Sequence, residues 1–123
     1  MILPFIISLF LTFIIVRTLA YFFHDMKNYG TNNEKSKTLT GYLRIKTGYD
    51  WHHFHLGILI LLITLPFIIT LGFNTLSVIF LAIGISMIID QSVPIIDRKS
   101  NYFNLKNVII SLIFHIIVSL LAI

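Results

Sequence analysis

The sequence LGILILLITLPFIITLGFNTLSVIFLAIGISMII, residues 56–89, decides the fold of this chain. It contains no charged side chain, and the turn-forming Gly72-Phe73-Asn74 divides it into two apolar halves. A helix needs about 20 residues, at about 1.5 Å each, to cross a hydrocarbon core about 30 Å thick. The stretch therefore predicts two membrane-spanning helices joined by a tight turn.

Two more apolar runs flank this pair. Of the 123 residues, 57% are hydrophobic and only 11% are charged, whereas a soluble domain carries about 25% charged residues. We therefore predict an all-α, polytopic membrane protein, a single domain over 1–123 with four transmembrane helices in a bundle. The helices are expected at about 2–23, 54–72, 75–92 and 105–123. The absence of cysteine excludes disulfides, thiolate metal sites and cysteine nucleophiles.

The basic residues indicate how the bundle is oriented. Four spans place 24–50 and the segment before the last span on one face, and both chain ends on the other. Lysine and arginine gather on or beside the first face, at Lys27, Lys35, Lys37, Arg44, Lys46, Arg98, Lys99 and Lys106. Positively charged loops stay in the cytoplasm. We expect a multi-pass protein of the cell membrane, with loop 24–50 cytoplasmic and both termini on the non-cytoplasmic side.

Histidines gather where this basic face meets the second span. His52 and His55 are three residues apart and share a helix face, while His53 points about 100° away. The topology brings His24 and Asp90 to the same membrane level from two other helices. Without thiolates, histidine and carboxylate are the ligands expected for zinc or iron. The sequence predicts a metal site of His52, His55 and Asp90, with His24 or His53 as a further ligand.

Such a site would suit a hydrolase that acts on a lipid or a lipid-linked substrate. In that hypothesis Asp90, His53 and Arg17 are the candidate catalytic residues, and the metal activates a water molecule. Arg17 could instead pair with Asp90 or hold an anionic head group, to which Arg44 and Lys46 could add phosphate contacts. Each residue also has a simpler interpretation. Boundary histidines and arginines often contact lipid head groups, and basic loop residues determine topology.

Other residues predict local features of the helices. Pro66 should kink the second helix, and Gly57 allows close approach of a neighbouring helix or a ligand. Pro94 either ends the third helix or lies within it, in which case the carbonyl of Asp90 loses its usual donor. Asn74 or Thr75 can cap the third helix, and Asn101 or Asn104 the fourth.

His115 lies about midway through the fourth apolar run, where an imidazole is unusual. It could bond across helices to Ser86 or Thr64, or it could be an axial ligand of a haem. No second histidine at matching depth is obvious in the sequence.

One pattern resembles a group of known proteins. The segment Arg44-x-x-x-Gly48-x-x-x-His52-His53-x-His55-x-Gly57, followed by Gly84-x-x-x-x-x-Asp90, is similar to small uncharacterised integral membrane proteins of archaea and bacteria. The resemblance covers roughly residues 44–91. It implies that Arg44, the three histidines and Asp90 belong together, and it brings no activity with it.

Three functions are compatible with the sequence. The first is the metal-dependent enzyme at the cytoplasmic boundary. The second is a small structural or accessory subunit of a larger membrane complex, since the chain has little mass outside the membrane. The third is a channel or transporter for protons or metal ions that uses the histidines and Asp90. The expected partners are membrane lipids and a larger complex or further copies of the chain, and no nucleic acid.

Overall fold

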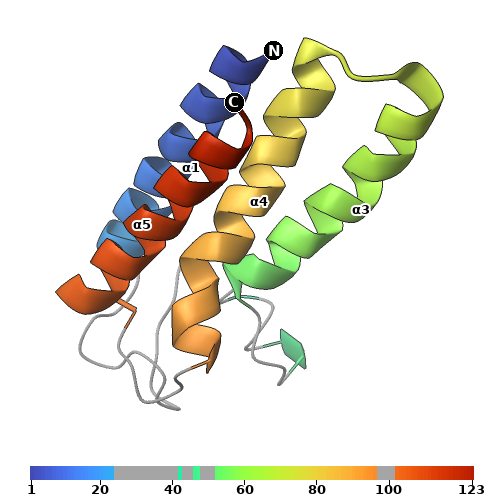
Figure 1. Ribbon diagram of the computed structural model, residues 1–123. Helices are drawn as coiled ribbons and strands as arrows, with labels where there is room; N and C mark the ends of the chain where they lie inside the picture. The colour runs from blue at the N-terminus through green and yellow to red at the C-terminus, as the bar shows by residue number, and fades with distance from the viewer. Residues whose placement is uncertain (24–41, 43–45, 48–51, 97–101) are drawn as a thin grey trace.

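The computed structural model describes residues 1–23, 42, 46, 47, 52–96 and 102–123. These residues form the helices α1 (Ile2–Phe23), α3 (His53–Leu71), α4 (Thr75–Ile96) and α5 (Leu105–Leu121), and they contain no strand (Figure 1). The predicted all-helical fold is therefore confirmed. Both termini lie at the same end of the bundle, as expected. Which side of the membrane this end faces stays a prediction.

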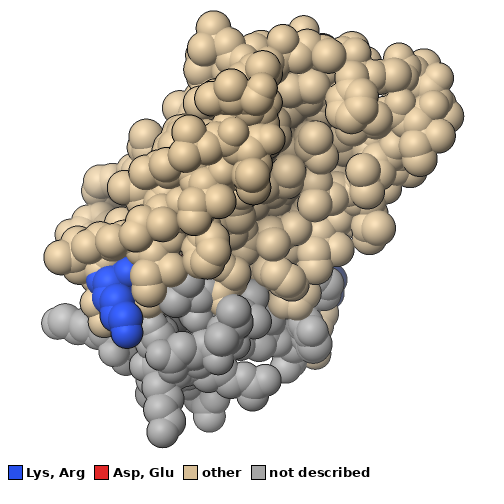
Figure 2. Space-filling view, viewed as in Figure 1, with Lys and Arg blue, Asp and Glu red and all other residues tan. Residues whose placement is uncertain are grey.

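Length and composition agree with a membrane protein. α1, α3 and α4 are each long and apolar enough to cross a bilayer. α5 is apolar but shorter, and its 17 residues extend about 26 Å. In the view of Figure 2, the surface of the described residues carries no acidic side chain, and its basic side chains lie at the end opposite the termini.

α4 is the central helix. α1 and α5 pack against it and, less extensively, against each other, and α3 also packs against α4. Figure 1 shows α3 close to α4 near the start of α3 and diverging from it toward the Gly72 turn. The described helices are therefore arranged around α4, with α3 packed closely on α4 near its own start and leaning away from it toward the Gly72 turn.

Two glycines bring α3 and α4 together. A Cβ atom added to Gly57 would lie 2.8 Å from the carbonyl oxygen of Gly84. A Cβ added to Gly84 would lie 2.7 Å from a methyl carbon of Leu61 and 3.1 Å from the carbonyl oxygen of Gly57. Two helix backbones approach this closely only where both lack side chains. The expectation that Gly57 admits a neighbouring helix is confirmed.

The helix ends and prolines have local explanations. Asn74 Oδ1 accepts a hydrogen bond from Ser77 N at 2.9 Å, and Asn104 Oδ1 accepts one from Lys106 N at 3.2 Å, so both predicted N-caps are present. α3 continues through Pro66, and α4 continues through Pro94 to Ile96. Of the two alternatives for Pro94, the continuing helix is the observed one. The carbonyl of Asp90 therefore lacks the donor that a residue other than proline would supply.

The interior of the bundle differs between its two ends. Near the termini, Phe5, Leu9, Val78 and Ala82 form an apolar cluster between α1 and α4. Toward the other end, most buried side chains are polar. The apolar cluster thus fills the space between α1 and α4 at the terminal end, where Ser77 and Ser119 are also buried, and most of the polar interior lies beyond it.

Candidate intramembrane polar site

The inner face of α5 is a stripe of polar side chains. Asn107, Ser111, His115 and Ser119 follow at intervals of four residues, and all are buried. Residues four apart share a helix face. α5 therefore turns its polar face into the bundle and its apolar face outward, as suits a helix surrounded by lipid.

Asp90, on α4, is the centre of the buried polar residues. Its side chain is 1% exposed, and three groups donate hydrogen bonds to its carboxylate. Arg17 Nε on α1 and Ser111 Oγ on α5 donate to Oδ1 at 2.7 and 3.1 Å. The hydroxyl of Tyr102 donates to Oδ2. The carboxylate thereby joins α1, α4, α5 and the turn before α5.

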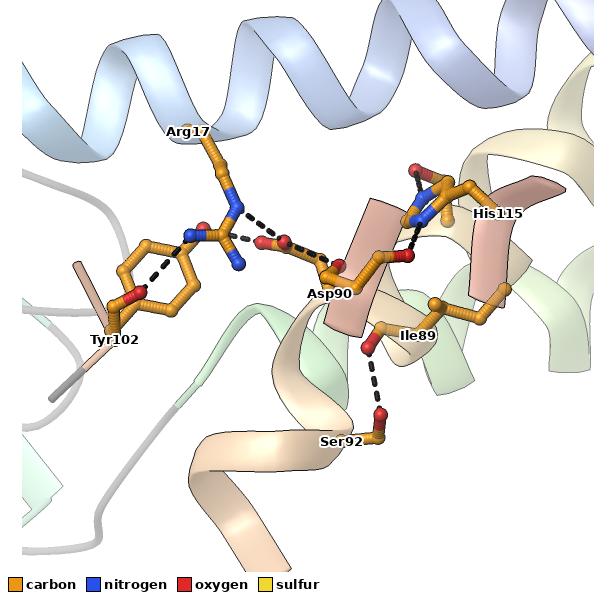
Figure 3. Close-up of polar contacts among 8 residues, drawn as sticks. Arg17, Ile89, Asp90, Ser92, Tyr102 and His115 are labelled. Carbon is orange, nitrogen blue, oxygen red and sulfur yellow. Dashed lines mark hydrogen bonds and ion pairs between the residues drawn. The ribbon is translucent and has the colours of Figure 1, made fainter. Parts of the chain in front are cut away.

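Arg17 is enclosed by aromatic rings as well as by the carboxylate. Its Nη1 donates to the backbone carbonyl of Tyr102 at 3.0 Å. Its guanidinium carbon lies 4.5 Å from the ring centroid of Tyr102 and 5.3 Å from that of Phe13. Figure 3 shows the side chain reaching from α1 toward both Asp90 and Tyr102. Such cation–π contacts stabilise a guanidinium more strongly where water is excluded.

His115 forms the deeper part of the site and is completely buried. Its Nδ1 lies 2.7 Å from the carbonyl oxygen of Ser111, and its Nε2 lies 2.9 Å from Ser86 Oγ on α4. A carbonyl oxygen only accepts, so Nδ1 carries the proton, and Nε2 of the neutral ring accepts from the Ser86 hydroxyl. The ring of Phe13 packs against the imidazole, with the ring centroids 4.7 Å apart.

Of the partners considered for His115, which were Ser86, Thr64 and a haem, the structure shows Ser86. The imidazole bonds across helices to Ser86, whereas the hydroxyl of Thr64 donates within its own helix to the carbonyl of Ile60 at 2.7 Å. Both imidazole nitrogens have partners, so a haem could be ligated only after one of these bonds breaks.

Among the described residues, two buried side-chain atoms have no hydrogen-bond partner: Nη2 of Arg17, in this site, and Oε1 of Gln91. Gln91 follows Asp90 on α4 and is 2% exposed. An unpaired buried donor or acceptor destabilises a fold by about 1–3 kcal/mol. The polar site is therefore not fully satisfied by the described residues, which is typical of a site that takes up water or an ion.

The described residues do not show a cluster of the predicted metal ligands. Among the residues that the structure describes, no three histidines or carboxylates lie close enough to hold an ion. His55 Nδ1 accepts a hydrogen bond from the backbone N–H of His52 at 3.1 Å, so this imidazole caps α3. Asp90 is held between α1 and α5 by Arg17. The described residues thus give no support to a shell of His52, His55 and Asp90.

Four other residues belong to the predicted site: His24, Arg44, His53 and Lys46. His24 and Arg44 lie outside the described residues. His53 is partly exposed in the first turn of α3, and Lys46 is exposed, with its Nζ 5.9 Å from the ring centroid of Tyr42. The roles proposed for these residues, and the choice of zinc or iron, stay predictions.

The pairing of Arg17 with Asp90, one of the alternatives considered for Arg17, is confirmed. Sequence reasoning missed Tyr102 and the buried stripe on α5. The stripe had a signal, the regular spacing of four between polar residues of an apolar run. Tyr102 had none, because a tyrosine beside a membrane boundary normally indicates an interfacial anchor.

Comparisons with known proteins do not assign the chain to a family. No family model, no curated protein and no solved structure matches the chain. The resemblance to small membrane proteins of archaea and bacteria therefore stays a prediction.

The Ser86–His115 bond can be measured with a double-mutant cycle. We expect Ser86→Ala and His115→Phe to be coupled by about 0.5–1.5 kcal/mol, the range of hydrogen bonds between transmembrane helices. The free energy of unfolding in detergent micelles is the readout. Ser92→Ala is the matched control, because Ser92 Oγ bonds within α4 to the carbonyl of Ile89. Its effect should add to that of His115→Phe, and additivity in the Ser86 cycle would contradict the bond.

Proposed function

We propose that the protein is a small membrane carrier that binds a cation, in the simplest case a proton, at Asp90 in exchange for Arg17. The observation that carries the proposal is the ion pair of 2.7 Å between these side chains, which are 1% and 12% exposed inside the bundle. Ionisable residues within membrane-spanning segments are expensive and usually mark ion or substrate pathways.

The exchange follows from the charges. With Asp90 ionised, the pair is neutral and the guanidinium has a counter-charge. When a proton neutralises the carboxylate, Arg17 keeps its bond to the Tyr102 carbonyl and its two aromatic contacts. These contacts supply an alternative environment for the released cation. A built-in cation that competes with the transported one gives the bundle two states, which transport requires.

The site is enclosed at both ends. The cluster of Phe5, Leu9, Val78 and Ala82 lies between the site and the chain termini, and Tyr102, 1% exposed, covers Asp90 at the other end. The polar stripe from Asn107 to Ser119 covers about 18 Å of a hydrocarbon core about 30 Å thick. An enclosed site and an incomplete polar path favour a carrier with alternating access over an open channel.

The two other functions receive less support from the described contacts. In an enzyme that used Asp90 as a ligand or base, the metal or substrate would compete with the three donors that already bond its carboxylate. A purely structural subunit does not need the ion pair, because well-packed apolar residues are often as stabilising as a buried pair. The metal-dependent enzyme and the accessory subunit stay predictions.

Asp90→Asn tests the proposal. In liposomes with a pH gradient and an internal pH-sensitive dye, we expect wild-type protein to speed the collapse of the gradient. Asp90→Asn should return the rate to that of empty liposomes, because an amide binds no proton. The single carbonyl oxygen of asparagine can still accept from Arg17 and Ser111, and its amide group can donate to the hydroxyl oxygen of Tyr102. Because the change leaves Arg17 without its counter-charge, circular dichroism in detergent must show that the variant is folded.

Lys106→Gln is the control, since it removes an exposed charge that does not contact the site. If transport needs a co-substrate that the liposomes lack, infrared spectroscopy still detects proton binding. Acidification should produce the C=O stretch of protonated carboxyl groups in both proteins, because four other acidic side chains remain in Asp90→Asn. The difference between the two spectra should contain one further band, that of Asp90. Identical spectra and identical rates for the two proteins would rule the proposal out.

A further inference from the structure

The two carboxylate oxygens of Asp90 differ in their partners. Oδ1 accepts from Arg17 Nε at 2.7 Å and from Ser111 Oγ at 3.1 Å. Within the part of the chain that the structure describes, Oδ2 accepts only from the hydroxyl of Tyr102. A carboxylate oxygen has about two acceptor positions, so those of Oδ1 are occupied and one remains on Oδ2. A cation that arrives at Asp90 therefore binds at Oδ2.

Tyr102 is held beside Oδ2 by contacts of its own. Its side chain is 1% exposed, and it lies in the turn before α5. Its backbone carbonyl accepts from Arg17 Nη1 at 3.0 Å, and its ring centroid lies 4.5 Å from the guanidinium carbon. Figure 3 shows the side chains of Tyr102, Arg17 and Asp90 next to one another. The hydroxyl of Tyr102 thus lies on the route from this end of the bundle to Oδ2.

A hydroxyl can pass on a proton without becoming charged, because it both donates and accepts hydrogen bonds. In the ionised pair, the Tyr102 hydroxyl donates its hydrogen to Oδ2. When a hydronium ion gives a proton to the phenol oxygen, the first hydrogen can transfer to Oδ2. Tyr102 then remains neutral with its new hydrogen, water is released, and the carboxyl group of Asp90 donates back to the phenol oxygen. One proton is taken up and one is bound.

A metal ion finds fewer ligands at this position. Ca²⁺ and Mg²⁺ take about six or more oxygen ligands, whereas the described oxygens bonded to this carboxylate are the two hydroxyls of Tyr102 and Ser111. The third partner, the guanidinium of Arg17, has no acceptor. Among the residues with a described position, no three histidine, cysteine or acidic side chains could hold a metal ion together. A proton needs only the free position on Oδ2.

The other titratable groups around Asp90 do not offer the same route. Arg17, on α1, bonds to Oδ1. His115, on α5, uses its two nitrogens for Ser86 and the carbonyl of Ser111. The titratable side chains of α3 are histidines in its first turn, and α4 has none besides Asp90. Only Tyr102 places an exchangeable hydrogen on Oδ2.

We propose that the cation carried at Asp90 is a proton and that the hydroxyl of Tyr102 transfers it to Oδ2. This inference rests on the proposed function, because it names the substrate of the same carboxylate. It makes Tyr102 a catalytic residue of proton uptake as well as the cover of the site.

Tyr102→Phe tests the transfer, because it removes the hydroxyl and keeps the ring and the backbone carbonyl that contact Arg17. In detergent micelles, time-resolved infrared spectroscopy follows the C=O stretch of Asp90 after a rapid drop in pH. Each protein is compared with its own Asp90→Asn variant. Tyr102→Phe should reach the wild-type amplitude about 100-fold more slowly, the low end of what a positioned proton-transfer group contributes. Tyr21→Phe, at a tyrosine that is 61% exposed, should keep the wild-type rate.

The tyrosine C–O stretch gives a second readout, since it differs between a phenol that donates and one that accepts. With ring-deuterated tyrosine, acidification should shift one band in the wild type and in neither Tyr102→Phe nor Asp90→Asn. An unchanged rate in Tyr102→Phe, or no shift in the wild type, would overturn the transfer. Loss of the Asp90 amplitude in Tyr102→Phe would do so too, because the hydroxyl would then be needed to hold the proton.

Sodium tests the choice of the proton. Replacing choline chloride with sodium chloride at a fixed pH should leave the amplitude of the Asp90 band unchanged. A smaller amplitude in sodium would show that a metal ion competes for the carboxylate, and would overturn the assignment of the proton. If the wild type gave no Asp90 band at any pH, the proposed function itself would fail, whatever the role of Tyr102.

Discussion

Arg17→Met should destabilise the bundle by about 3–5 kcal/mol, because it leaves the carboxylate of Asp90 buried without a counter-charge. Asp90 is 1% exposed, and Arg17 is its only ionised donor among the described residues; Tyr102 and Ser111 donate as neutral groups. The free energy of unfolding in detergent micelles measures the effect. The change also removes the contacts of the guanidinium with Phe13 and Tyr102.

The double variant Arg17→Met/Asp90→Leu separates lost charge balance from lost packing. If the cost of the single change comes from an uncompensated charge, removing both charges should restore most of the lost stability. Lys106→Met, which removes an exposed charge, should change stability by less than about 0.5 kcal/mol. A double variant no more stable than Arg17→Met would show that the aromatic contacts of Arg17, and not its charge, hold the helices together.

Gly57→Ala should destabilise the α3–α4 contact by about 1–3 kcal/mol, the cost of overfilling a close-packed interface. The added methyl group would meet the Gly84 carbonyl oxygen at 2.8 Å, and also Met87 Cβ and Ile88 Cγ1 at 3.0 Å. A backbone oxygen cannot rotate away as a side chain can, so α3 must move. Gly57→Val should have a larger effect. Single spin labels on introduced cysteines in α3 and α4 should report a longer distance between the helices.

Gly72→Ala is an informative comparison for this effect. A Cβ at Gly72 would meet nothing within 4 Å, but the residue has φ +74° and ψ 178°, which only glycine adopts readily. We expect a cost of about 1–3 kcal/mol from backbone strain. This cost should not rise with the size of the new side chain, whereas that at Gly57 should. A flat response at Gly57 would contradict the close helix contact.

The polar interior explains how α5 is held in an apolar solvent. Lipid tails are as apolar as leucine, so burial of apolar side chains gives transmembrane helices little net attraction for each other. Ser111 and His115 instead bond α5 to α4 through Asp90 and Ser86. In this bundle the polar groups therefore contribute to cohesion as well as to the proposed cation site.

The sequence by itself determined the four long helices and their approximate bounds, three of which are long and apolar enough to span a membrane. Each follows from one-dimensional information, the length of an apolar run compared with the thickness of a membrane. It also gave Asp90 as one of the possible partners of Arg17, and Ser86 as one of those of His115, because a charged or polar group within a membrane needs a partner. The close approach at Gly57 followed from the missing side chain.

Only the tertiary structure decided which neighbour each polar side chain meets. Each residue turns a helix by about 100°, so a small rotation of α4 would turn Asp90 from α1 and α5 toward the histidines of α3. A helix with apolar residues on every side has no amphipathic face to fix that rotation. The rotation is set by packing, at Gly57 and Gly84, by the pairing with Arg17, and by Tyr102 from a distant turn. The divergence of α3 depends on the same contacts.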